Sequence, residues 1–235
     1  MIYYDDPFDH WVVDNFLDLK LAETLSDEFL DYNDPNWFGY NNPLENKKTL
    51  NNFYYYPPTT YQFISYLNSP KFIMILNKLT GNVLMPDIGM HGAGWHIYGR
   101  GGKLNVHFDY SIHPKLNLQR KLNIIIYLTK DWDVSWGGGL QFWSHNQLTN
   151  KPYTKVKTID FKFNRAVIFD TTKHAWHGFP EPLTCPEHIY RKSIALYYLC
   201  KPPKDIDQRK RALYAPSELQ MNDPDIERLI IERSK

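Results

Sequence analysis

Cysteine is scarce in this sequence, which has only Cys185 and Cys200 among its 235 residues. Two cysteines supply neither a disulfide framework nor the ligands of a structural zinc site, and they favour a reducing compartment. An excess of one charge is missing as well, because 27 Lys and Arg residues against 26 Asp and Glu residues leave a net charge of +1. This balance gives no reason to expect nucleic acid or an anionic membrane as a partner.

Long apolar runs and targeting signals are missing too. No stretch approaches the ~20 consecutive apolar residues that a membrane-spanning helix requires. The first residues, MIYYDDPFDHW, are acidic and aromatic, unlike a secretory signal peptide. We therefore expect a cytoplasmic protein with no membrane partner.

The sequence does contain enough apolar residues for a substantial core, with 43% hydrophobic and 16% aromatic residues. The first third favours helices. Apolar residues in 18–32 recur at helical spacing, and 69–81 begins with Ser-Pro and ends with Gly, the usual start and stop of a helix. Residues 34–52 are rich in Pro, Gly and Asn and are predicted as loop. Residues 201–235 form a charged tail that ends in a predicted surface helix.

From about residue 92 the pattern changes to short segments rich in β-branched and aromatic residues, separated by turn clusters. Eight strands are predicted, at 93–99, 104–110, 121–129, 138–145, 154–162, 165–171, 174–179 and 191–199. Short strands at this spacing favour a β-sandwich or jelly roll over a parallel α/β sheet. We predict one mainly β domain over 1–235, with helical support at 1–84, a jelly-roll core at 85–200 and the tail at 201–235.

The segment LNVHFDYSIH (104–113) carries polar residues where a buried strand would carry apolar ones. Because alternate side chains of a strand share a face, Asn105, His107 and Asp109 are expected opposite Leu104 and Val106. A chain with nine histidines contains roughly one His-x-Asp by chance. The His-x-Asp tripeptide alone is therefore weak evidence of a functional site, and other parts of the sequence must support that interpretation.

That support comes from HAWHGF (174–179), which supplies His174 and His177 on a late strand. Two imidazoles and one carboxylate on one face of a metal leave the other positions open, an arrangement that selects non-haem Fe(II) and activates O2. On strand parity His174 and His177 face opposite ways, so only one of them should join His107 and Asp109.

An anion site is indicated by YRKSIALYYL, where Arg191 begins an otherwise apolar strand and shares a face with Ser193. A buried guanidinium without a partner is costly, and its planar fork matches a carboxylate. In LNIIIYLTKDW, Tyr127 shares a face with Asn123. Tyr127 could donate a second hydrogen bond to the same carboxylate, or it could be an ordinary core tyrosine.

Taken in this order, the motifs resemble those of the Fe(II)/2-oxoglutarate-dependent dioxygenases, and among them the prolyl 4-hydroxylase-like branch with its phage- and bacterium-encoded members. The resemblance covers about residues 85–200. It rests on the separated segments GAGWHIYGRGGKLNVHFDYS, YLTKDW, WGGGLQFW and HAWHGFPEPLTCPEHIYRKSIALYYL.

The resemblance implies that His107, Asp109 and His177 are the metal ligands and the catalytic residues. His177 directly precedes the Gly of a "WHG" element, as the metal histidine does in the family. His174 is then structural or an outer partner of the site. A carboxylate at position 109 favours hydroxylation over halogenation.

The resemblance also implies a co-substrate site, in which Arg191 pairs with the far carboxylate of 2-oxoglutarate. Tyr127 and Ser193 are expected to help it. Tyr98 lies near a tyrosine that touches the co-substrate in relatives, and Asn123 is a further candidate for the lining.

The implied reaction is hydroxylation of an unactivated C–H bond, coupled to decarboxylation of 2-oxoglutarate to succinate and CO2. Fe(II), 2-oxoglutarate and O2 are the implied cofactor and co-substrates, and ascorbate is a further candidate cofactor. The favoured substrate is a prolyl residue of a peptide or protein. The alternatives are the same chemistry on an amino acid, sugar or metabolite, and a non-enzymatic jelly-roll binding module. Nucleic acid is not expected, because IALYYL replaces the second arginine of the nucleic-acid demethylases.

Some expectations concern the surroundings of the site. Residues 41–58 and 111–121 are candidate lids, and 180–188 is expected at the mouth of the site. Lys115, Arg120 and Lys121, in the second of these lids, are interpreted as a solvated face, with an acidic or phosphorylated partner as the alternative. The chain is expected in the cytoplasm of a bacterial or virus-infected host cell, as a monomer or a homodimer.

Overall fold

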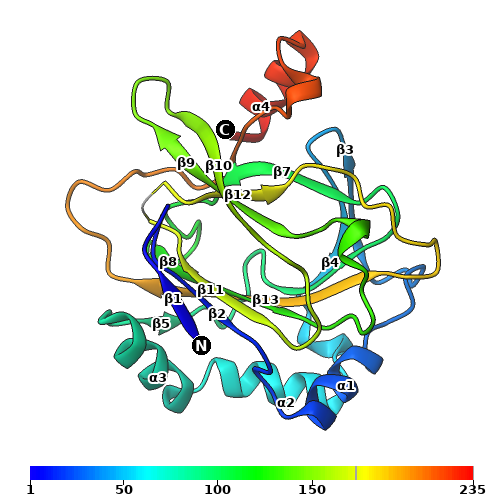
Figure 1. Ribbon diagram of the computed structural model, residues 1–235. Helices are drawn as coiled ribbons and strands as arrows, with labels where there is room; N and C mark the ends of the chain where they lie inside the picture. The colour runs from blue at the N-terminus through cyan, green and yellow to red at the C-terminus, as the bar shows by residue number, and fades with distance from the viewer. Residues whose placement is uncertain (173, 235) are drawn as a thin grey trace.

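The computed structural model describes residues 1–172 and 174–234 of the chain. Its main feature is one curled antiparallel sheet, with three helices packed against the outer face (Figure 1). The strand order along the sheet is β1-β2-β11-β8-β13-β6-β4-β7-β12-β9-β10, and β14, β3 and β5 pair at its sides. The fold is therefore mainly β with a jelly-roll core and flanking helices, as the sequence predicts.

The strands in chain order are β1 (Ile2–Tyr4), β2 (His10–Val13), β3 (Phe38–Asn42), β4 (Glu45–Leu50), β5 (Met85–Pro86), β6 (Gly94–Tyr98), β7 (Lys103–Phe108), β8 (Gln119–Tyr127), β9 (Leu140–Asn146), β10 (Lys151–Ile159), β11 (Ala166–Asp170), β12 (Trp176–Phe179), β13 (Arg191–Cys200) and β14 (Leu213–Tyr214). The helices are α1 (Leu19–Asp27), α2 (Pro58–Leu67), α3 (Pro70–Thr80) and α4 (Pro224–Ser234), with single 3₁₀ turns at Phe53–Tyr55, Val134–Trp136 and Glu218–Gln220.

All eight predicted strands are present, as β6 to β13, with ends shifted by up to three residues. The sequence analysis missed the remaining strands and α2. The largest error concerns 34–52, predicted as loop, where β3 and β4 form a hairpin and β4 also pairs with β6 and β7. The polar side chains of this hairpin, such as those in ENKKTL, do not alternate with apolar ones. Its strands form through pairing with a sheet whose other members lie far away in the sequence.

The helices α1 to α3 cover the outer face of the sheet and bury a large apolar core against it (Figure 1). Even-numbered residues of β8 and β13, such as Ile124 and Leu196, belong to this core. The predicted start and stop of α3 are confirmed. The Ser69 hydroxyl accepts a hydrogen bond from the Phe72 N–H at 3.3 Å, and Gly81 ends the helix with φ 69°. None of the described helices is both long and apolar enough to traverse a bilayer.

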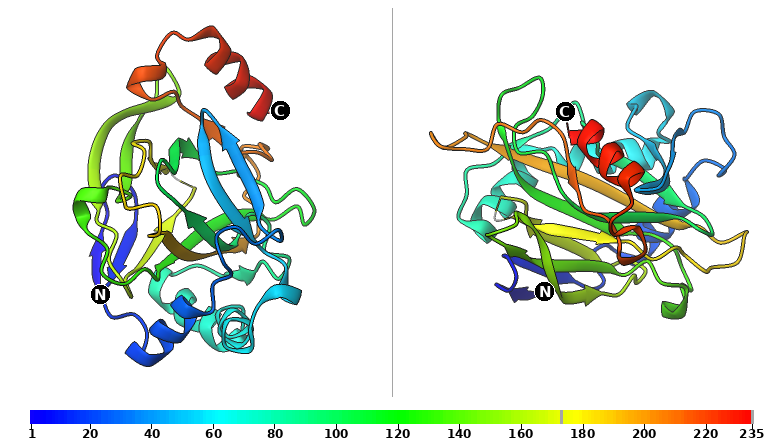
Figure 2. Two further views of the ribbon diagram at one scale, coloured as in Figure 1. Left: turned by 90° about the vertical axis from the view of Figure 1, so that its right-hand side faces the viewer. Right: turned by 90° about the horizontal axis from the view of Figure 1, so that it is seen from above.

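The C-terminal tail contains a strand in addition to the predicted surface helix. Before α4, the short strand β14 pairs with β7, with Tyr214 opposite His107. The helix α4 then lies beyond the far edge of the curl, on the side opposite α1 to α3 (Figures 1 and 2). The tail therefore joins the same part of the sheet as the His-x-Asp segment.

A bulge interrupts β7 where it pairs with β12. His177 lies opposite His107, but Phe179 lies opposite Leu104, so three steps on β7 match two steps on β12. The bulge contradicts the expected parity. The Asn105 side chain does not share the face of His107 and instead donates hydrogen bonds to the Ala215 carbonyl and to Gln220 in the tail, at 3.0 and 2.7 Å.

Gly178 permits this close contact of β12 with the bulge. A Cβ atom at Gly178 would lie 2.8 Å from the backbone oxygens of Leu104 and Asn105. We therefore expect Gly178→Ala to lower the free energy of unfolding by about 1–3 kcal/mol, because backbone rather than a flexible side chain must move. Chemical denaturation measures this. Gly39→Ala, where a Cβ meets nothing within 4 Å, is the matched control, and an equal effect of both substitutions would contradict the explanation.

Candidate active site

A cavity of about 650 Å³ opens inside the curl of the sheet. Its size lies within the usual range of small-molecule sites. Residues of β4, β6, β7, β8, β12 and β13 form the walls, and the tail before β14 contributes further lining residues. The odd-numbered residues of β8 and β13, including Asn123 and Ser193, face this cavity, while their even-numbered neighbours face the helices.

The structure brings His107, Asp109 and His177 together on one wall of the cavity. One possible ligand atom from each lies within 4.8 Å of the other two. The His107 Nε2 is 3.6 Å from Asp109 Oδ1, and the His177 Nε2 is 3.7 Å from Asp109 Oδ2. All three side chains are buried. Within residues 1–172 and 174–234, this is the one cluster of three or more His, Cys, Asp or Glu residues with such spacing.

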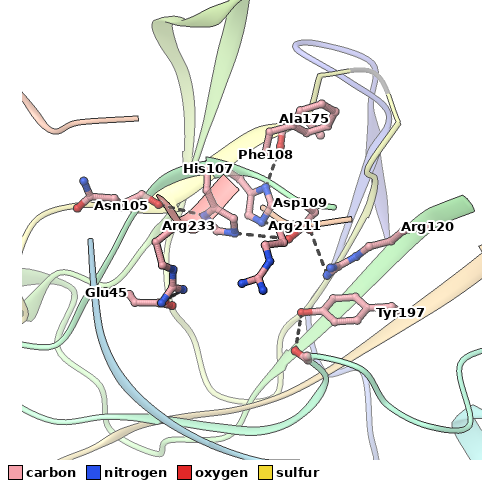
Figure 3. A network of polar contacts seen from close by, with 12 residues as sticks. Glu45, Asn105, His107, Phe108, Asp109, Arg120, Ala175, Tyr197, Arg211 and Arg233 are labelled. Atoms are coloured by element: carbon pink, nitrogen blue, oxygen red, sulfur yellow. Dashed lines mark hydrogen bonds and ion pairs between the residues drawn. The ribbon is translucent and has the colours of Figure 1, made fainter. Parts of the chain in front are cut away.

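Both imidazoles are oriented by backbone carbonyls. His107 Nδ1 lies 3.0 Å from the Asn105 oxygen, and His177 Nδ1 lies 2.8 Å from the Ala175 oxygen (Figure 3). A carbonyl only accepts, so each Nδ1 carries the hydrogen and each Nε2 keeps a free lone pair. Burial and the neighbouring His107 lower the pKa of His177 to about 3. The ring is therefore neutral, which is the form that binds a metal ion.

Asp109 is held by a second buried charge, that of Arg120. The Arg120 Nη2 lies 3.1 Å from Asp109 Oδ2, and its guanidinium carbon lies 4.6 Å from the centre of the Tyr110 ring. Burial raises the pKa of Asp109, but Arg120 and the two histidines outweigh it and hold this pKa well below its ordinary value. The carboxylate is therefore ionised across the physiological pH range.

The prediction of a solvated Arg120 is wrong, since its side chain is only 3% exposed. The reason is a second irregularity of register, on β8. Tyr198 pairs with Leu122 but Leu199 pairs with Arg120, so Lys121 is an extra residue. This shift turns Arg120 onto the cavity face, which simple alternation from Asn123 would assign to Lys121.

Arg191 also lines the cavity and is buried, at 3% exposure. Its Nε donates to the Gly138 carbonyl at 2.9 Å, and its guanidinium lies 4.5 Å from the centre of the Phe179 ring. No carboxylate among the described residues lies within ion-pair distance of it. Burial lowers the pKa of Arg191. An unpaired buried guanidinium in a cavity is a strong site for an anion.

Gly138 of the WGGGLQFW segment allows this placement of Arg191. Its φ is 78°, a left-handed conformation that favours glycine. A Cβ at this position would also lie 3.0 Å from Arg191 Cδ and 2.8 Å from a methyl group of Leu183. The glycine therefore lets its own carbonyl approach and bind the guanidinium.

The other predicted co-substrate residues surround Arg191. Tyr98, Ser193 and Asn123 line the cavity. Tyr127 is fully buried and does not line it, although its ring centre lies 5.0 Å from the Arg191 guanidinium. Its hydroxyl has no hydrogen-bond partner among the described residues.

Of two predictions about neighbouring segments, the one for His174 agrees with the structure and the one for 180–188 does not. His174 lies before β12, outside the cluster, and its ring stacks on His145 at 3.8 Å. The segment 180–188, expected at the mouth, contributes no residue to the cavity lining. Its Leu183 packs instead with Tyr98 and Phe179 behind the wall.

Several cavity residues come from distant parts of the chain and are not predicted by the sequence pattern. Glu45 of β4 is 1% exposed, and it pairs with Lys47 at 3.0 Å and with Arg233 of α4 (Figure 3). The ring of Tyr214 stacks on His107 with 5.3 Å between ring centres. No local signal marks these residues, because their position depends on the pairing of β4 and β14 with β7.

A comparison with protein families matches residues 93–199 to the 2OG-Fe(II) oxygenase superfamily. Prolyl 3-hydroxylase OGFOD1 of Mus musculus is 27% identical over 210 residues, which cover 84% of this chain and 34% of that protein. The chain thus spans about a third of the length of this curated relative.

Solved structures with a similar fold have low sequence identity. A prolyl-4-hydroxylase of Pseudomonas putida has a TM-score of 0.55 at 13% identity, covering 82% of this chain and 92% of that one. A prolyl hydroxylase of Trichoplax adhaerens, in complex with a hypoxia inducible factor peptide fragment, has a TM-score of 0.51 at 19% identity, covering 81% and 83%. HygX of Streptomyces hygroscopicus, with nickel, 2-oxoglutarate and hygromycin B bound, has a TM-score of 0.52 at 12% identity, covering 85% of each chain.

The matched segment 93–199 contains both imidazoles, the carboxylate and both buried arginines of the cavity. The matched segment is therefore similar to the 2OG-Fe(II) oxygenase superfamily, and the chain shares its jelly-roll fold with the solved structures above.

Proposed function

We propose that this protein is an Fe(II)- and 2-oxoglutarate-dependent oxygenase of the prolyl 4-hydroxylase-like branch that hydroxylates a prolyl residue of a peptide or protein. The observation that carries the proposal is one cavity with two kinds of site. His107, Asp109 and His177 offer two nitrogens and one oxygen, while Arg191 offers an unpaired guanidinium. 2-Oxoglutarate, a metal-binding keto acid with a second carboxylate, needs both the metal site and the guanidinium.

The donor set fits Fe(II). Two neutral imidazoles and one carboxylate, with open space on the cavity side, form the facial arrangement of non-haem iron oxygenases. When bound, Fe(II) with 2-oxoglutarate and O2 supplies the oxidation of the C–H bond, with succinate and CO2 as the other products. The protein itself orients these reactants and limits access of water.

The other residues in and around the cavity bind or stabilise charged groups. Arg191 pairs with the distal carboxylate of 2-oxoglutarate, and Ser193 and Tyr98 lie on the same wall to complete its hydrogen bonds. Asn123 lines the neighbouring wall, and Tyr127 supports Arg191 from behind. Arg120 keeps Asp109 ionised and in place.

A peptide substrate is favoured by the shape of the rim. The described residues of α1 to α3 contribute nothing to the cavity lining, so these helices do not cap it. The rim is formed by Phe38 and Tyr40 of β3, and Phe38 is 63% exposed. Arg120 has a buried Nε without an acceptor among the described residues, which a peptide carbonyl would satisfy.

The similar proteins also favour a peptide substrate. One is a prolyl 3-hydroxylase, and one solved structure holds a peptide. A small molecule is the alternative, because HygX shares the fold and holds hygromycin B. The proposal also includes a single dioxygenase domain over 1–235, a cytoplasmic location and ascorbate as a further cofactor.

Removal of a metal ligand should abolish tight metal binding. We expect His177→Ala to weaken Mn(II) binding by more than the roughly 10–100-fold typical of losing an outer partner. Anaerobic isothermal titration calorimetry measures it. His174→Ala is the matched control, because His174 lies three residues away and outside the cluster. If His174→Ala weakened binding as much as His177→Ala, the proposed ligand set would be wrong.

Substitution of Arg191 should act on the co-substrate. Since losing one partner of a buried charge pair costs about 3–5 kcal/mol, Arg191→Met should raise the KM for 2-oxoglutarate by about a hundredfold or more. Arg191→Lys, which keeps the charge but loses the fork, should restore only part of the affinity. Arg100→Met, at an arginine that does not line the cavity, is the control. An unchanged KM in Arg191→Met would remove the assignment.

The substrate class is tested by mass spectrometry of host-lysate peptides treated with the enzyme. We expect prolyl residues to gain one oxygen atom only when both Fe(II) and 2-oxoglutarate are present. Asp109→Ala, which removes a proposed ligand, provides the background. Succinate release with hydroxylated small molecules but no hydroxylated peptide would favour the alternative.

A further inference from the structure

The tail crosses the cavity mouth as a strap, residues 209–215, that is fixed at both ends. At one end the Arg209 carbonyl accepts hydrogen bonds from the N–H groups of Ser111 and Ile112, at 2.9 and 3.1 Å. At the other end the Ala215 N–H donates to the Val106 carbonyl at 2.8 Å. The strap is therefore held between the strand that carries His107 and the segment after that strand, and its middle residues have a defined position.

Lys210 and Arg211 lie between these two anchors, and both are exposed residues that line the cavity. Figure 3 shows the Arg211 guanidinium extending into the space between Arg120 and Arg233, below Asp109. Neither Lys210 nor Arg211 has a side-chain hydrogen bond or ion pair with any described residue. Two cations thus face the cavity without a partner.

The whole cavity has a local excess of positive charge, although the chain has a net charge of only +1. Its lining includes two carboxylates and six Lys or Arg side chains. The carboxylates are Glu45 and Asp109, and the cations are Lys47, Arg120, Arg191, Lys210, Arg211 and Arg233. Ion pairs within the protein occupy both carboxylates, and 2-oxoglutarate occupies Arg191 in the proposed function. The two cations of the strap remain for the substrate.

We propose that Arg211, assisted by Lys210, binds an anionic side chain of the substrate next to the hydroxylated residue, so that the enzyme selects acidic peptide segments. This inference rests on the proposed function and names its substrate class. The planar fork of Arg211 matches a carboxylate or a phosphate bidentately, whereas Lys210 adds a point charge. Since the strap is anchored, its backbone loses little conformational entropy when the anion binds.

The test compares four fluorescent peptides that share a central proline and differ only in flanking residues, which are Glu, phosphoserine, Gln or Lys. Binding to the enzyme loaded with Mn(II) and 2-oxoglutarate is measured by fluorescence anisotropy. The wild type should bind the Glu peptide about five- to tenfold more tightly than the Lys peptide, and the difference should shrink at high salt. Tighter binding of the phosphoserine peptide than of the Glu peptide identifies phosphate as the anion.

Charge reversal supplies the decisive comparison. Arg211→Glu should remove or invert the preference, whereas Lys204→Glu, an exposed cation of the same tail outside the cavity, should leave it in place. Equal affinities of the wild type for the Glu and Lys peptides, or a preference that survives Arg211→Glu, would overturn the inference. Succinate release by the wild type is measured separately. Its absence would contradict the oxygenase proposal, while the peptide preference needs no turnover.

Discussion

The site depends on the pairing of β7 with β12, which sets His107 opposite His177. Two strands from separate parts of the chain each supply one imidazole, and the carbonyls of Asn105 and Ala175 hold the two Nδ1 hydrogens. Turning either ring over would leave a buried carbonyl without its donor, which is costly. The hydrogen bonds of the chain itself therefore suffice to point both Nε2 atoms at one place beside the carboxylate.

Among the described residues, the buried charges around this point divide into those with partners and one without. Asp109 has Arg120, and Glu45 has Lys47, so the cost of burying these ions is partly offset inside the protein. Arg191 has only neutral rings and a carbonyl. A fold does not gain stability from an uncompensated buried guanidinium. The burial of Arg191 is therefore explained by an external anion that pairs with it. By the same reasoning, a buried charge without a partner indicates a binding group, unlike the many charged residues of a protein surface that have a structural role.

Sequence reasoning works here where period and motif are local. The eight strands of the core and the ends of α3 follow from spacing within short segments, and the choice of His177 over His174 follows from the resemblance of the WHG element to the family motif. It fails at two single-residue irregularities. The bulge on β7 turns Asn105 away from the cavity, and the extra residue on β8 turns Arg120 into it. In a regular strand, a period of two predicts the face to which every side chain points. One extra residue reverses this assignment for the residues beyond it, and the amino-acid composition does not reveal where it lies.

The remaining errors have a different cause and a functional meaning. The hairpin β3–β4 and the strand β14 form only because a distant strand pairs with them, so their polar sequences resemble loops. The hairpin supplies the rim of the cavity, and the strap that leads into β14 supplies its unpaired cations, Lys210 and Arg211. The proposed metal ligands and the proposed 2-oxoglutarate arginine instead all lie within 93–199, the part that matches the superfamily. On the proposed function, reaction chemistry and substrate choice therefore depend on separate parts of this chain. A substitution in the strap or hairpin can change which substrate is bound while the oriented imidazoles, which depend on β7 and β12, stay as they are.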